Sequence, residues 1–143
     1  MKFSNYMSLE FPSRSSNEAF ARSAVACFAA QLDPTLEELG DIRTAVSEAV
    51  TNCIVHAYPG TIGNITLRCR ILKDNTIDIV IKDKGVGIVD IEAARRPSFS
   101  TGGNDRSGMG FTIMESFMTS LDVSSKQGKG TTVHMRRKLI RRQ

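Results

Sequence analysis

The stretch TAVSEAVTNCIVHAYPG, residues 44–60, has the apolar spacing of an amphipathic helix and ends at a Pro-Gly pair. Within it Glu48, Asn52 and His56 recur every four residues, so a helix places them on one face. Asparagine is a poor residue for a helix interior, because its side chain competes for backbone hydrogen bonds. A helix that only filled a core would have no use for this polar line, which therefore indicates a candidate functional face.

Length and composition indicate one globular domain over residues 1–143. The 143 residues are 41% hydrophobic and 24% charged, which suits a single domain with its own core. No apolar run approaches the roughly 18–20 residues that span a membrane, and the first residues lack the apolar segment of a signal peptide. The cysteines, Cys27, Cys53 and Cys69, are odd in number and form no C-x-x-C pair. We therefore expect reduced thiols and a cytoplasmic protein without a membrane segment.

The net charge is +4, and much of it comes from the stretch RRKLIRRQ, residues 136–143. The rest of the chain is therefore close to neutral. A basic end of this kind can bind nucleic acid, but it is more often a solvated segment or an edge strand that charge protects. Direct nucleic-acid binding is for this reason the least favoured function.

Hydrophobic periodicity predicts three helices and five strands. Ser15 and Glu18 have the spacing of a capping box, and Asp33-Pro34 suits a second helix start. The predicted helices cover residues 17–31, 33–57 and 111–121. The predicted strands cover residues 7–13, 65–72, 76–83, 122–126 and 131–139. The order β-α-α-β-β-α-β-β predicts an α+β fold, a two-layer sandwich in which helices cover one face of a mainly antiparallel mixed sheet.

The same spacing predicts which sides of the first two helices are buried. The core side of the first helix is predicted to be Phe20, Ala24, Cys27 and Phe28. That of the second helix is predicted to be Leu36, Leu39, Ile42, Val46, Ala49, Val50, Cys53 and Ile54.

Two glycine pairs stand at the ends of predicted elements. Gly85 and Gly87 follow the strand that ends at Asp83, and Gly108 and Gly110 open the last helix. Neither pair extends to G-x-G-x-x-G, and there is no P-loop sequence, so both of those nucleotide motifs are excluded. Asp83 is either a common turn residue or a hydrogen-bond acceptor in a pocket whose glycine wall admits a flat ring.

The second glycine pair has two interpretations as well. Backbone N–H groups at a helix start can bind phosphate, and Arg106 and Ser107 add a cation and a hydroxyl beside them. A glycine turn that lets the helix pack is an equally good explanation. The preceding segment, RRPSFSTGGNDRSG, is polar and rich in glycine, which is typical of a functional lid or of disorder.

Taken together, the motifs resemble the N, G1 and G2 boxes of the GHKL ATPase superfamily, which includes gyrase, Hsp90, histidine kinases and MutL. The resemblance rests on Glu48-x-x-x-Asn52, Asp83-x-Gly85-x-Gly87, Gly108-x-Gly110 and Gly130-Thr131-Thr132, in this order. Within the superfamily the chain looks like the anti-sigma factor serine kinases of spore-forming bacteria. That narrower resemblance rests on SEAVTNCIVHAY, DKGVGI, RSGMGFTIMESF, GKGTTV and the amino-terminal RSSNEAFARSAVACFAAQLDPTLEEL.

The resemblance implies a fold and a function. The fold would be the GHKL, or Bergerat, type. The protein would be a homodimer that binds and inhibits a sporulation sigma factor of the sigma F type. It would also use ATP and Mg²⁺ to phosphorylate a serine of an anti-anti-sigma partner, and it would bind ADP at the same site.

The resemblance also implies a role for each matching residue. Asn52 would bind Mg²⁺ through its amide oxygen, and Glu48 would be the general base that takes the proton of the substrate serine. Asp83 would bind the adenine amino group. The remaining nucleotide contacts would come from Gly85, Gly87, Arg106, Ser107, Gly108, Met109, Gly110 and Thr131. Glu18 and Arg22, on the first helix, would hold the sigma factor.

One feature departs from the family pattern. Related lids carry a lysine before R-S-G-M-G, whereas this chain has STGGNDRSGMG, without a lysine. Two alternatives to the sporulation kinase therefore remain. One is a sigma-binding protein whose affinity for the sigma factor depends on the bound nucleotide and which has little catalytic activity. The other is the general-stress relative. His56 is better explained as a cation at a helix end or as a pocket-rim residue than as a proton carrier. His134, in a strand predicted to lie near an edge, is expected to be structural.

Overall fold

The computed structural model describes residues 3–96 and 110–140. Its strands are β1 (Phe3–Pro12), β2 (Asn64–Leu72), β3 (Thr76–Asp83), β4 (Ser120–Lys126) and β5 (Gly130–Lys138). Its α-helices are α1 (Ser16–Ala29), α2 (Leu36–Asn52), α3 (Ile91–Arg95) and α4 (Gly110–Phe117). A 3₁₀ turn, Ala30–Leu32, follows α1, and a π-helical turn, Cys53–Ala57, follows α2. We call the latter the π turn.

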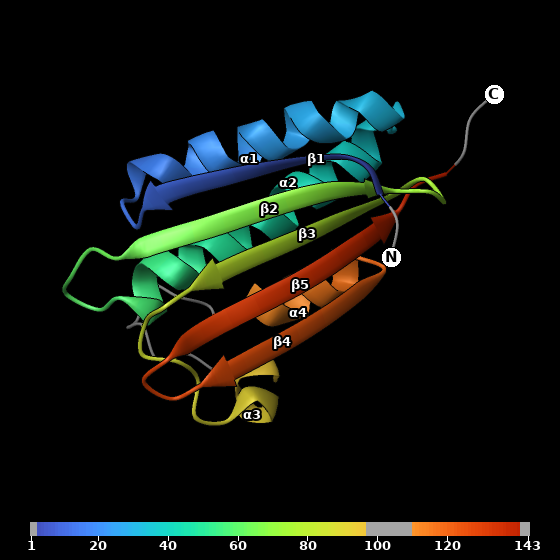
Figure 1. The fold of residues 1–143 in the computed structure, drawn as a ribbon. Coiled ribbons are helices and arrows are strands. Elements are labelled where there is room, and N and C mark those ends of the chain that lie inside the picture. The colour runs from blue at the N-terminus through green and yellow to red at the C-terminus, as the bar shows by residue number, and fades with distance from the viewer. Residues whose placement is uncertain (1–2, 97–109, 141–143) are drawn as a thin grey trace.

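The strands form one sheet in the order β1-β2-β3-β5-β4, and the helices lie against one of its faces (Figure 1). This confirms the predicted two-layer α+β fold. Every pairing between the described strands is antiparallel, so the mixed character that we expected is not present among them. The reason is local: β2 with β3 and β4 with β5 are hairpins, and two helices between β1 and β2 return the chain in the opposite direction.

The core lies between the sheet and the helices. Alternate residues of β2 and β3 point into it and are fully or almost fully buried, namely Ile65, Leu67, Cys69, Ile77, Ile79 and Ile81. The apolar side of α2 covers them with Ile42, Val46, Ala49 and Val50. The period-two pattern of the strands and the helical period of α2 were both visible in the sequence, and both predictions are confirmed.

The predicted core side of α1 is confirmed for Phe28, which packs against the core, but the fully buried residues lie about one residue further around the helix. Ala21, Val25 and Ala29 are fully buried, whereas Phe20 is 54% exposed and Cys27 is exposed as well. The buried residues are small, so α1 can pack closely on α2. The larger side chains were assigned to the core from their hydrophobicity, and the close packing of two helices favours the small ones instead.

Both predicted helix starts also need correction. Ser15 makes no side-chain cap, and the Glu18 carboxylate accepts two hydrogen bonds from Arg22, at 2.7 and 2.8 Å. Ser15 already has helical dihedrals, φ −57° and ψ −31°, whereas a capping residue is usually extended. The second helix is capped by Thr35 and not by Asp33, through a capping box with Glu38 at 2.8 and 2.9 Å.

The other differences lie at the start of the first strand, near residues 90–121 and in the second helix. The first strand begins at Phe3 and not at residue 7. Leu36, predicted to be in the core, is 89% exposed because it begins α2. The last helix ends at Phe117 and not at residue 121, because β4 takes up the chain at Ser120 and buries Leu121. A short helix, α3, lies in the segment that we expected to be irregular. None of the described helices is long and apolar enough to cross a membrane.

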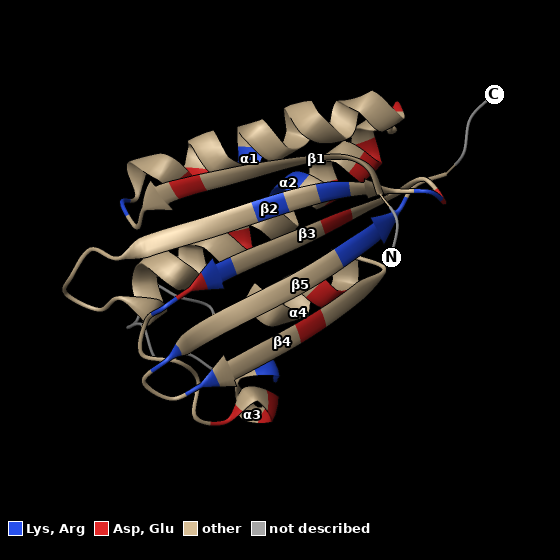
Figure 2. Cartoon of the chain, in the orientation of Figure 1, with Lys and Arg blue, Asp and Glu red and all other residues tan. Residues whose placement is uncertain are grey.

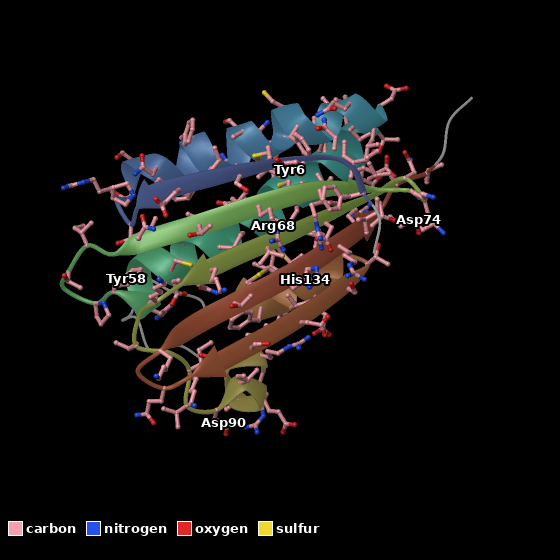
Figure 3. The ribbon with its side chains drawn as sticks, in the orientation of Figure 1. Tyr6, Tyr58, Arg68, Asp74, Asp90 and His134 are labelled. Carbon is pink, nitrogen blue, oxygen red and sulfur yellow. The ribbon has the colours of Figure 1, made fainter. Side chains whose placement is uncertain are left out.

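The face of the sheet that no helix covers carries an ion-pair cluster. Asp78 on β3 is fully buried there, between Arg70 of β2 and Arg136 of β5 in the strand register. Its carboxylate accepts from Arg70 at 3.0 Å and from Arg136 at 2.7 Å, and it lies 2.5 Å from the His134 ring. Figure 2 shows acidic and basic positions on the neighbouring strands β2, β3 and β5, and Figure 3 shows His134 and Arg68 on the same face. His134 is thus structural, although β5 is an inner strand and not an edge.

We expect Asp78→Asn to destabilise the fold by about 1.5–3 kcal/mol at pH 7, because hydrogen bonds to a charged group would be lost. Burial alone would raise the pKa of Asp78, but the hydrogen bonds from Arg136, His134 and Arg70 outweigh it and lower that pKa. A carboxylate with a lowered pKa stabilises the fold above its unfolded value, near 3.8, and this contribution disappears as the pH falls through the folded value.

Urea unfolding of the wild type and of Asp78→Asn, at pH 7 and near pH 3, measures this difference. The difference in the free energy of unfolding between the wild type and Asp78→Asn should be smaller at the lower pH. Glu10→Gln, a change of an exposed carboxylate on the same sheet face, is the matched control and should stay within about 0.5 kcal/mol. An equal gap at both pH values would contradict the role of the Asp78 charge.

Candidate functional site

The polar line of α2 meets the start of α4. Gly110, the first residue of α4, packs against the side chains of Asn52 and Glu48. A Cβ atom at Gly110 would lie 3.3 Å from both amide atoms of Asn52 and 3.4 Å from Oε1 of Glu48. The two polar side chains therefore reach the same point, as the sequence spacing predicted. A glycine at this position leaves room beside them.

A cavity of about 600 Å³ opens next to this point. It lies between the end of α2, the segment after β3, α3, the start of α4 and the start of β5. Six of its polar or small lining residues are Asn52, His56, Asp83, Gly87, Gly110 and Thr131. Six of its apolar ones are Ala49, Val55, Ile88, Ala94, Phe111 and Val133. A largely apolar cavity with a few converging polar groups is the usual form of a small-molecule site.

The Asp83 carboxylate is buried in the wall of this cavity, with 6% of the residue exposed. Its Oδ1 accepts from the backbone N–H of Gly85 at 2.9 Å and from that of Thr131 at 3.1 Å. Its Oδ2 accepts from the thiol of Cys53 at 3.5 Å, which is a weak donor. Among the hydrogen bonds of the described residues, Oδ2 therefore has only this weak donor.

Cys53 remains a thiol and not a thiolate. Burial raises the pKa of Cys53 well above its usual value, and the charge of Asp83 raises it further. The S–H group is therefore present at neutral pH to donate to Oδ2 of Asp83. We had assigned this cysteine to the core, and the structure shows that it also lines the cavity.

The two glycines after β3 allow the backbone to pack against two neighbours. Val86 N–H donates to Ala57 O at 2.9 Å, and Val86 O accepts from Gly128 N–H at 2.8 Å. A Cβ at Gly85 would overlap the Ala57 carbonyl, and one at Gly87, where φ is +80°, would overlap the Lys126 carbonyl. Residues 84–88 therefore form a layer between the π turn and the β4–β5 turn. From the sequence we expected only that these glycines leave space in a pocket for a flat ring.

The π turn changes the place of His56. We predicted a regular α-helix to residue 57, but α2 ends at Asn52 and Cys53–Ala57 is π-helical. A π turn takes more residues per turn than an α-helix, so His56 does not continue the line from Glu48 and Asn52 with α-helical spacing. His56 lines the cavity, in agreement with the pocket-rim interpretation.

Two further residues could not be found from the sequence, one behind the cavity wall and one in it. Ser125 Oγ lies 2.8 Å from Oγ1 of Thr131 and accepts from Ile88 N–H at 2.7 Å, so it joins the cavity wall to the segment after β3. Asp90 caps α3 through Ala93 N–H at 3.0 Å and also lines the cavity. Neither residue stands in a recognisable motif, and only the tertiary contacts reveal them.

The other predicted site residues do not line the cavity or cannot be placed. Arg106, Ser107, Gly108 and Met109 lie outside the described residues. Glu18 and Arg22 pair with each other on α1 at 2.7 Å, and neither lines the cavity. In the described part of the chain, no group of three or more His, Cys, Asp or Glu side chains could hold a metal ion.

Comparisons with known proteins show the family of the chain. The model of the family described as histidine kinase-like ATPase domain matches residues 11–137. An anti-sigma F factor of Caldanaerobacter subterraneus subsp. tengcongensis is 58% identical over 136 residues, which are 94% of this chain and 94% of the relative. Another, of Geobacillus stearothermophilus, is 50% identical over 140 residues, which are 97% of this chain and 96% of the relative.

Two solved structures share the fold. The RsbU and RsbW domains of a Mycobacterium tuberculosis protein match with a TM-score of 0.72 at 16% identity, over 97% of this chain and 34% of that one. The mycobacterial sensor histidine kinase MprB matches with a TM-score of 0.59 at 16% identity, over 95% of this chain and 100% of that one. These two likenesses concern the fold alone. The family model and the relatives at 50% identity or more show that the chain belongs to the histidine kinase-like ATPase domain family and, within it, to the anti-sigma F factors.

Proposed function

We propose that the cavity binds ATP and ADP. The observation that carries this proposal is the orientation of the Asp83 carboxylate. Backbone N–H groups occupy Oδ1 of its carboxylate, which leaves Oδ2 to accept from an adenine amino group. The cavity volume of about 600 Å³ and its apolar walls suit a flat ring. Thr131 lies in the wall beside Asp83, where its hydroxyl can assist.

Glu48 and Asn52 fit the phosphate end of the same molecule. Asn52 offers a neutral amide oxygen, a ligand type that Mg²⁺ accepts together with water and phosphate oxygens. Mg²⁺-bound ATP supplies the phosphoryl group. Gly110 exposes backbone at the start of α4, next to Asn52, and we propose that Gly108, Met109, Arg106 and Ser107 complete the phosphate contacts.

We further propose that the protein is a serine kinase. Glu48 stands one helical turn before Asn52, on the same side of α2. Its carboxylate would take the proton of a serine hydroxyl as that oxygen bonds to the γ-phosphorus and ADP leaves. The serine would belong to an anti-anti-sigma partner. Positioning and charge neutralisation would supply most of the rate acceleration.

The relatives are named anti-sigma F factors, and this supports a sigma factor of the sigma F type as the binding partner. We propose that the protein inhibits this sigma factor in the cytoplasm during sporulation, as a homodimer, and that Glu18 and Arg22 make part of the contact. The two side chains are partly exposed on α1, with 21% and 36% of their surfaces accessible. The general-stress relative is less favoured, because these relatives carry the sigma F name.

A second function is favoured by one specific observation. The segment before R-S-G-M-G contains no lysine, in contrast to the family pattern. Nucleotide would in that case tune sigma binding with little phosphoryl transfer. The two functions differ in a single measurement, the labelling of the anti-anti-sigma partner by ATP.

Asp83→Asn should weaken ATP binding at least tenfold, because a charge-assisted hydrogen bond of about 1.5–3 kcal/mol is lost. Isothermal titration calorimetry with ATP and Mg²⁺ measures the dissociation constant. Asp122→Asn, a change of an exposed carboxylate that does not line the cavity, is the control. Unchanged affinity in a folded Asp83→Asn protein would reject the cavity as the adenine site.

Glu48→Gln should reduce phosphoryl transfer by about 100-fold or more while ATP affinity stays nearly constant, because the amide cannot take a proton. Transfer of label from γ-labelled ATP to the purified anti-anti-sigma partner is the measurement. Glu37→Gln, on the exposed first turn of α2, is the control. Transfer at the wild-type rate would exclude Glu48 as general base, and an unlabelled partner with the wild type would support the second function.

Arg22→Ala should weaken the complex with the sigma factor about tenfold or more, because it removes a partly exposed guanidinium from the proposed contact. Surface plasmon resonance with immobilised sigma F, with ATP and then with ADP, measures the effect. Arg43→Ala, a change of an exposed arginine on α2, is the control. If both variants bind like the wild type, α1 is not the docking helix.

A further inference from the structure

Tyr58 is the first residue after the π turn, and it is 9% exposed. Figure 3 shows it at the end of α2, beside the connection to β2. Tyr58 does not line the nucleotide cavity, although its neighbours Ala57 and Pro59 do. Any effect of Tyr58 on a bound nucleotide must therefore pass through other residues.

The Tyr58 hydroxyl joins two strand ends. It donates to the carbonyl of Asn64, the first residue of β2, at 2.7 Å. It also accepts from the backbone N–H of Lys84 at 2.7 Å. A phenol has one proton to donate and lone pairs to accept with, so it can make both bonds at once.

The second of these bonds acts on Asp83. The N–H group of Lys84 belongs to the peptide unit that begins with the carbonyl carbon of Asp83, and a peptide unit is planar. The phenol therefore fixes the orientation of the peptide plane that follows the Asp83 side chain. Gly85 N–H, one residue further along, holds Oδ1 of the same carboxylate.

The Tyr58 ring has little freedom to move. A Cβ at Gly63 would overlap the ring, so the ring lies directly on the Gly63 backbone. One residue earlier, Ala57 O accepts from Val86 N–H at 2.9 Å. Two consecutive residues at the end of the π turn thus hold Lys84 and Val86, on either side of Gly85.

We propose that Tyr58 is a positioning residue for adenine selection, which acts by fixing the peptide next to Asp83 and so the direction of its carboxylate. This inference rests on the proposed binding of ATP. The adenine amino group donates to a carboxylate, whereas the hypoxanthine ring of ITP has a carbonyl oxygen at that position and repels it. The ratio of the ITP and ATP dissociation constants therefore reports how well Asp83 is directed.

The test compares Tyr58→Phe with the wild type by calorimetry, using ATP and ITP with Mg²⁺. Phe keeps the ring and removes only the hydroxyl. We expect ATP affinity to fall about three- to tenfold, with a much smaller change for ITP. The ratio of the ITP to the ATP dissociation constant should therefore decrease by a similar factor. Tyr6→Phe is the matched control, because Tyr6 is the only other tyrosine of the chain and is 61% exposed on β1.

Each outcome decides between specific alternatives. An unchanged ratio in Tyr58→Phe overturns the inference, whether both affinities are kept or both fall equally, since an equal fall indicates a general structural role. A wild type that binds ATP and ITP alike rejects the proposed role of Asp83, and the inference with it. If Tyr58→Phe does not fold, Gly63→Ala, which displaces the ring, takes its place. The same decrease in the ratio of the ITP to the ATP dissociation constant is then expected, and its absence overturns the inference.

Discussion

The cavity depends on a packing constraint on the backbone after β3. Residues 84–88 lie between the carbonyl of Ala57 and the β4–β5 turn, and both contacts are backbone hydrogen bonds. The space is narrow enough that a side chain at Gly85 or Gly87 would overlap backbone carbonyls. The constraint holds Asp83 at the cavity wall, where Gly85 and Thr131 donate to one carboxylate oxygen and the Cys53 thiol donates to the other. The end of α2, the end of β3 and the start of β5 thus form one wall.

The helix α2 serves two purposes on two of its sides. Its apolar side is fully buried against the sheet, which is worth about 1.5–3 kcal/mol for each Val or Ile side chain. Asn52 in place of alanine costs only a few tenths of a kcal/mol in helix propensity, so the burial easily outweighs it. The polar side is therefore available for Glu48 and Asn52, which meet the start of α4 where Gly110 leaves space. The ion-pair cluster around Asp78 lies on the opposite face of the sheet and takes no part in the cavity.

The strands and the polar line could be predicted because their signals are local. The predicted strands 65–72 and 76–83 agree with β2 and β3 to within one residue, since period-two alternation is a property of neighbouring residues. The error in the predicted core side of α1 has a different origin. The hydrophobicity of Phe20 favours a core position, but α1 packs closely on α2 and therefore buries Ala21 and other small residues instead. The distance between two helices depends on both of them, so the sequence of α1 alone does not predict it. Ser15 and Asp33 are likewise residue types that often cap helices, but their backbone dihedrals are not the extended ones of a capping residue.

The order of the motifs can be read directly from the sequence. The helical spacing of Glu48 and Asn52 and the α+β class follow from it as well, because both depend on patterns among residues close to one another. Two of the three hydrogen bonds of Asp83 do not, since their donors come from residues 53 and 131. The same is true of the π turn, of Ser125 beside Thr131 and of Tyr58 between β2 and β3. Folding brings these distant segments within hydrogen-bonding distance, and that proximity places Asp83 and Asn52 around one cavity.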